Sequence, residues 1–176
     1  MLLPSLISRS KLVAESISGF RLAARDRFED AIELASADHR TGAIYLWGYA
    51  AEMTLKAAYF SLIGFDDSKP IERNPDLKDA ISRASKVIQG LSNAMPDEER
   101  GHNVRAWAEM LVETRANDST KTPYAARFGR EIQKYGQRIE QLWRVTLRYR
   151  HVDAYFCEVL QMHQAVRWFL DHSDEL

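Results

Sequence analysis

One segment of this chain combines residue types that can handle phosphate chemistry. In the run R-V-T-L-R-Y-R-H, Arg144 and His151 stand seven positions apart. Seven residues make almost two helical turns, so on a continuous helix these two side chains would share one face, about 10 Å apart along the axis. Arg148 lies between them on that face, and Arg150 and Tyr155 extend the polar surface. The spacing therefore predicts an exposed row of cations with a histidine and a tyrosine.

Such a row fits three interpretations. Arginine presents planar, charged donors that match phosphate oxygens, so the face could bind a phosphate or a nucleic acid, with Arg148, Arg150 and Tyr155 holding the substrate. Metal-independent RNA cleavage would add His151 as the base or acid and Arg144 as the stabiliser of the developing charge. The simplest interpretation is a solvated helix end, whose cations complement the helix dipole without any ligand.

A second group of polar residues lies in surroundings that should be buried. The stretch Gly42–Gly64 is apolar on nearly every side of a helix, which is typical of a helix enclosed by others. It nevertheless carries Glu52 and Lys56, four residues apart and in the order that lets them pair. An unpaired charge there would cost several kcal/mol (order of magnitude), so we expect these two to hold each other. We expect His102, at the start of a later helix, to tie its loop to the bundle.

The elements that position these residues are all predicted to be helices. Apolar residues recur at helical spacing, alternation typical of strands is not found, and turn residues separate the segments. Thr41 is the expected N-cap of the central helix. The predicted helices cover Arg21–Ala37, Gly42–Gly64, Asp76–Leu91, His102–Ala116, Tyr124–Arg150 and Ala154–His172. We predict an all-α, up-and-down bundle of about five helices over residues 21–172, with an N-terminal extension (1–20) and a C-terminal tail (173–176).

Three segments together resemble the HEPN superfamily. They are A-I-E-L-A-S in the first helix, A-A-E-M-T-L-K-A-A-Y-F in the central helix and G-H-N-V before a later helix. The resemblance covers roughly Arg25 to Leu170. It implies a four-to-five-helix bundle in which an acid and a lysine lie on the second helix of a hairpin.

The resemblance also implies two classes of function. Many HEPN proteins are metal-independent ribonucleases of toxin or defence systems, with an arginine and a histidine separated by four to six positions; Arg144 and His151 match the outer limit. Others are non-catalytic partners of nucleotidyltransferases, or bind nucleotides. Val145 stands where catalytic members usually place a polar residue, which favours the non-catalytic class. In both classes the resemblance implies a homodimer, and in a toxin system an antitoxin partner.

Local sequence adds modest support for a dimer and for RNA. The last predicted helix carries more large apolar residues than one core-facing stripe needs: Phe156, Leu160, Val166, Trp168, Phe169 and Leu170. Between Arg127 and Arg150 there are seven basic and two acidic residues, a local excess of +5 on a chain with a net charge of −1. We therefore expect an interaction module that binds a protein or a nucleotide or RNA partner, with metal-independent RNA cleavage as the alternative.

Composition restricts the compartment and the cofactors. With Cys157 as the only cysteine among 176 residues and no recognisable signal peptide, we expect a cytoplasmic protein. The charges within Gly42–Gly64 argue against a membrane span. Cys157 and His163 have no third ligand nearby, and the single Glu99-x-x-His102 lacks the second copy of a di-iron site, so neither a metal nor a cofactor is expected.

Overall fold

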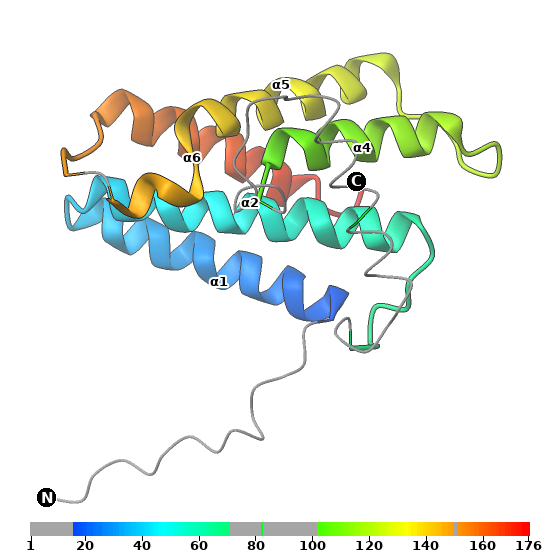
Figure 1. Ribbon diagram of the computed structural model, residues 1–176, viewed down its shortest axis with the longest axis horizontal. Coiled ribbons are helices and arrows are strands. Elements are labelled where there is room, and N and C mark those ends of the chain that lie inside the picture. Colours follow the sequence, from blue (N-terminus) through cyan, green and yellow to red (C-terminus); the bar gives the residue numbers. More distant parts are fainter. Residues whose placement is uncertain (1–15, 71–81, 83–101, 150) are drawn as a thin grey trace, which may run out of the picture.

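The structure, a computed structural model, describes residues 16–70, 82, 102–149 and 151–176. Within these ranges five α-helices and one short 3₁₀ helix can be traced in full, and none of the described residues forms a strand. The elements are α1 (Ile17–Ser36), α2 (Arg40–Leu62), α4 (Val104–Asn117), α5 (Ala126–Leu142), the 3₁₀ helix η4 (Val145–Tyr149) and α6 (Phe156–Asp171). The predicted all-α bundle is confirmed (Figure 1).

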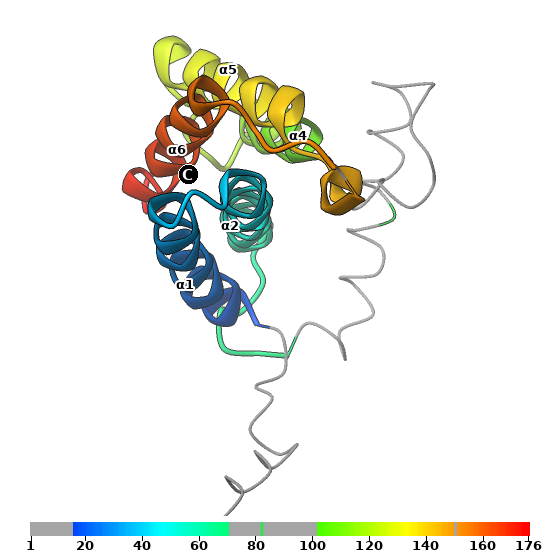
Figure 2. The same ribbon diagram turned by 90° about the vertical axis from the view of Figure 1, so that its left-hand side faces the viewer.

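Helix α2 is the central element of the bundle. The end-on view in Figure 2 shows it next to α1, α6 and α4, with α5 beyond α4 and α6. Its buried positions cover most of the helix circumference, which agrees with a pattern that is apolar on nearly every side. Alanines such as Ala43, Ala50 and Ala51 are fully buried, so neighbouring helices can approach closely. The buried aromatic rings of Trp47, Phe60 and Trp107 fill the space that remains.

A glycine in α2 makes room for a tryptophan that comes from far along the chain. A Cβ atom at Gly48 would lie only 2.1 Å from ring atoms of Trp143. The Trp143 ring is 2% exposed, and its indole Nε1 donates to the backbone carbonyl of Tyr45 at 3.0 Å. The ring therefore packs directly on the backbone of α2 and fixes the chain just after α5.

This contact explains the largest difference from the predicted elements. The helix expected over Tyr124–Arg150 ends at Leu142, and Trp143 is extended, with φ −128° and ψ 132°. Turning out of the helix brings the Trp143 ring onto α2. The chain then continues as η4, so the expected continuous helix to Arg150 is wrong.

Smaller differences concern the other helix ends. Helix α1 begins at Ile17, before the predicted Arg21, and Ser16 caps it by accepting from the Gly19 backbone N–H at 3.0 Å. Thr41 lies inside α2 and is not its N-cap. In the expected C-terminal tail, Leu176 is 7% exposed and belongs to the core. The helix predicted over Asp76–Leu91 lies outside the described residues, except for residue 82.

Candidate functional site

The predicted pair in the central helix and His102 form a three-residue cluster around one buried carboxylate. Glu52 is 4% exposed, and one of its carboxylate oxygens is in a salt bridge with Lys56, as expected. The other oxygen lies 2.9 Å from His102 Nδ1. A carboxylate can only accept, so Nδ1 donates the hydrogen of this bond. His102 thus connects the start of α4 to the middle of α2.

Aromatic rings close the space around this cluster. The ring of Tyr49 lies edge-on to His102 and to Trp143, with centroid distances of 6.2 Å and 5.4 Å. The adjoining cavity, lined by His102 and Arg144 among others, has a volume of about 10 Å³. That is about the space of a single water molecule. The cluster joins α2 to the residues before α4, and Tyr49 links it to Trp143 at the end of α5.

The predicted Arg144 and His151 site is not arranged as the spacing suggested. Because α5 ends at Leu142, the two residues stand on either side of η4 and share no helix face. Both are exposed, and Arg144 lines the small cavity beside His102. Arg148 belongs to η4, and Arg150 lies outside the described residues.

One end of the bundle instead exposes five large apolar side chains. This apolar end patch comes from the last residue of η4, the connection that follows and the first turns of α6. Its members and their exposed fractions are Tyr149 65%, Val152 66%, Tyr155 66%, Phe156 68% and Leu160 47%. Figure 1 shows that the three segments meet at the same end of the molecule, beside the α1–α2 turn.

The sequence signal for this patch was incomplete. The structure divides the surplus apolar residues of the last helix: Val166 and Phe169 enter the core, whereas Phe156 and Leu160 remain exposed. Tyr149 falls within the longer helix expected over Tyr124–Arg150. With that helix ending at Leu142, the tyrosine moves to the surface.

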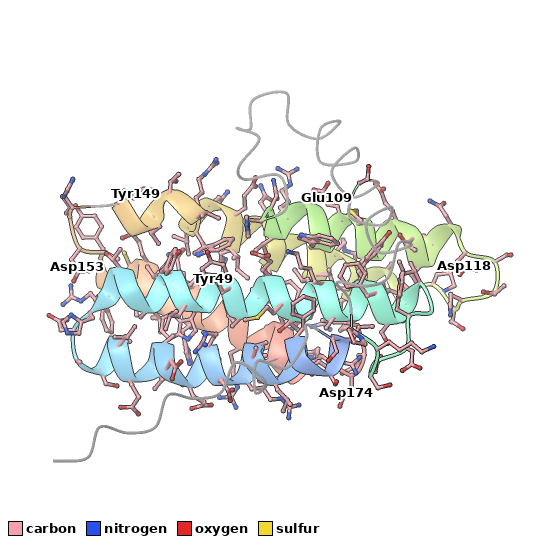
Figure 3. All side chains as sticks on the ribbon, turned by 60° about the horizontal axis from the view of Figure 1, so that its bottom comes forward. Tyr49, Glu109, Asp118, Tyr149, Asp153 and Asp174 are labelled. Atoms are coloured by element: carbon pink, nitrogen blue, oxygen red, sulfur yellow. The ribbon has the colours of Figure 1, made fainter. Side chains whose placement is uncertain are left out.

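A side chain in the connection holds the patch in place. The carboxylate of Asp153 accepts from the Thr41 backbone N–H and from its hydroxyl, both at 2.8 Å. The Ala154 backbone N–H in turn donates to the Thr41 hydroxyl at 3.0 Å. These bonds, the backbone bond from Thr41 first, lower the pKa of Asp153. Asp153 thereby supplies the N-terminal cap that α2 lacks locally, and Figure 3 shows it at the same end as Tyr149.

The described residues contain no group of three or more His, Cys, Asp or Glu side chains suited to a metal ion. None of the helices described is both long and apolar enough to cross a bilayer. Comparisons with protein-family models, with curated proteins and with solved structures found no match. The geometry of the chain therefore has to carry the functional conclusion.

Proposed function

We propose that this chain is an HEPN-like helical interaction module that acts as a homodimer, with the apolar end patch as the contact between two copies. The observation that carries the proposal is the exposure of five large apolar side chains within residues 149–160. Single exposed apolar residues are ordinary, but a concentration of this kind marks an interaction site. Two tyrosines and a phenylalanine belong to it, and aromatic residues are enriched at protein interfaces.

The area of the patch suits a dimer. A large aromatic side chain has roughly 150–250 Å² of surface, so three aromatic and two aliphatic side chains that are 47–68% exposed present roughly 500–600 Å². A stable interface of standard size buries about 800 Å² on each partner. The patch thus supplies about two-thirds of what is needed before any flanking residue is added.

The charges within the patch segment are compatible with self-association. In a two-fold contact each residue faces the same surface of the partner, so exposed carboxylates would repel their copies. Asp153 is bonded to Thr41, and Glu158 accepts from the Tyr155 backbone N–H at 2.6 Å. Both carboxylates are therefore engaged within their own chain, which leaves the apolar side chains to form the centre of the contact.

Sedimentation velocity on the full chain and two variants tests the proposal. We expect a particle of twice 20.2 kDa for the parent and a monomer for Phe156→Glu, since a two-fold axis would bring two new charges together. Leu22→Glu is the matched control, because Leu22 is 65% exposed on α1 and lies outside the patch. A parent that is monomeric at about 100 µM, or a Phe156→Glu variant that remains a dimer, would refute the proposed contact.

RNA cleavage, the alternative from the sequence, has lost the shared helix face on which its geometry rested. It is tested directly by incubating RNA with the protein in EDTA, together with Arg144→Ala and His151→Ala. Cleavage by the parent that both variants abolish would replace the binding module with a ribonuclease. Absence of cleavage leaves the module as the function.

A further inference from the structure

A cavity of about 340 Å³ opens between α1 and α6, on a side of α2 that no predicted site uses. Its walls are mainly apolar, formed by Ile32 and Ala35 of α1, Trp47 of α2, and Val159 and Leu160 of α6. This volume lies at the lower end of the range of small-molecule sites, roughly 300–1,000 Å³. The space is therefore sufficient for a molecule of one or two rings.

The wall of this cavity contains a buried hydrogen-bond donor without an acceptor. Trp47 is 2% exposed, and among the described residues its indole Nε1 has no hydrogen-bond partner. Such groups are rare in folded proteins, because a buried donor left unpaired loses its hydrogen bonds to water without replacement. By contrast, the equally buried Trp143 donates its Nε1–H to a backbone carbonyl at 3.0 Å. Trp47 Nε1 has less than 1 Å² of accessible surface, so an acceptor bound in the cavity reaches it when a covering side chain moves aside.

A histidine lines the same cavity. The His163 ring stacks on Phe28, with a centroid distance of 5.3 Å, and lies edge-on to Trp47 at the same distance. No hydrogen bond joins it to the part of the chain that the structure describes. Burial first, and then the nearby Arg167, lowers the pKa of His163, so the ring is neutral at neutral pH. A neutral imidazole offers one donor and one acceptor.

The mouth of the cavity has no excess charge. Asp38 and Arg40 lie at its rim, and the Arg40 guanidinium binds the Asp38 carboxylate, with Nη2 and Oδ1 2.7 Å apart. The two charges offset each other at the entrance. A charged ligand would leave water without gaining a counterion, so the surroundings favour an uncharged one.

We propose that this cavity binds an uncharged small aromatic molecule that carries a carbonyl-type acceptor for the Trp47 Nε1–H. The rings of Trp47, His163 and Phe156 provide aromatic surfaces, and the indole N–H fixes the position of the acceptor. Phe156 and Leu160 belong both to this cavity and to the apolar end patch, whereas Trp47, which carries the donor, lies outside the patch.

The test uses two probes of nearly identical shape. Acetophenone carries a carbonyl oxygen where α-methylstyrene carries a methylene group. Binding of each probe is followed by the shifts of the ¹⁵N-labelled indole resonances. The Trp47 resonance is the one that is missing from the spectrum of Trp47→Phe. In that variant, binding is followed through the remaining indole resonances and nearby backbone amides. We expect saturable binding and a ratio of ketone to hydrocarbon affinity that falls about fivefold in Trp47→Phe, the effect of one net hydrogen bond. Using the ratio cancels the different solubilities of the probes.

Two further variants complete the experiment. Trp143→Phe, which removes a satisfied indole that does not line this cavity, should leave the ratio unchanged, and Ala35→Leu should weaken both probes by filling the space. An equal ratio in the parent and in Trp47→Phe would overturn the proposal, as would the absence of saturable binding by either probe. Binding that Ala35→Leu leaves intact would place the probes elsewhere and would also overturn it.

Discussion

Two buried tryptophans allow the unpaired donor to be measured directly. Trp47 and Trp143 are each 2% exposed, and changing either to phenylalanine removes the same atoms from the core. They differ in the indole Nε1–H, which in Trp143 donates to the Tyr45 carbonyl at 3.0 Å and in Trp47 has no partner among the described residues. The difference between the two variants therefore isolates the fate of one hydrogen bond.

The expected magnitude follows from the asymmetry of hydrogen bonding. Trp143→Phe loses a satisfied bond with a net contribution of about 1 kcal/mol, whereas Trp47→Phe removes an unpaired donor that costs about 1–3 kcal/mol. Trp143→Phe should thus have the lower free energy of unfolding, by about 2–4 kcal/mol. At about 2–4 °C per kcal/mol for a chain of this length, a gap of about 2 kcal/mol already separates the melting temperatures by about 4–8 °C.

Urea unfolding followed by far-ultraviolet circular dichroism provides the measurement. Both variants are compared at one protein concentration, because self-association makes stability depend on concentration. Equal m-values would show that the denatured states are comparable. If Trp47→Phe proves as unstable as Trp143→Phe, or less stable, the indole of Trp47 is satisfied in solution and the cavity argument loses its basis.

Three further predictions use the same unfolding assay. Gly48→Ala should lower the free energy of unfolding by about 1–3 kcal/mol, because its Cβ would lie 2.1 Å from the tryptophan ring packed there. In the control Gly42→Ala, the nearest atom to the new Cβ would be 3.4 Å away, so the free energy of unfolding should rise by about 0.5–1 kcal/mol. A Gly48→Ala variant more stable than Gly42→Ala would contradict the packing of Trp143 on Gly48. Lys56→Met should lower the free energy of unfolding by about 3 kcal/mol, because the buried Glu52 carboxylate loses its cation. Adding Glu52→Leu to this variant should recover much of the loss. If the losses of the two single variants simply add in the double variant, Glu52 and Lys56 do not stabilise each other. The pKa of His163 is lowered from 6.5 in the folded state, so the free energy of unfolding should fall as the pH drops below about 6.5. If a His163→Leu variant loses stability with pH as steeply as the parent, His163 is not the cause.

The parts of the fold that short-range spacing controls were accessible from the sequence. The apolar character of Gly42–Gly64 predicted a central enclosed helix, since a helix needs burial wherever its surface is apolar. The contact between Glu52 and Lys56 followed from their separation of four residues, because helix geometry alone brings such side chains together.

The end of α5 depended on a contact that spacing does not encode. No proline or glycine follows Gly136 to mark the stop, and apolar residues at helical spacing continue to Tyr149. The helix ends because Trp143 packs on Gly48, a residue almost a hundred positions earlier. The predicted face shared by Arg144 and His151 disappeared for that reason.

The remaining features of the candidate sites are equally long-range. Asp153 caps α2 through Thr41, and His102 reaches Glu52, across separations of 112 and 50 residues. By itself the sequence determined which segments are helical and which helix lies at the centre, because those properties depend on residues within a few turns of one another. Only the tertiary structure decided where α5 stops, which apolar side chains stay at the surface and which indole N–H is left unpaired. Each of these is set by a neighbour distant in the chain, whose approach the local pattern does not record.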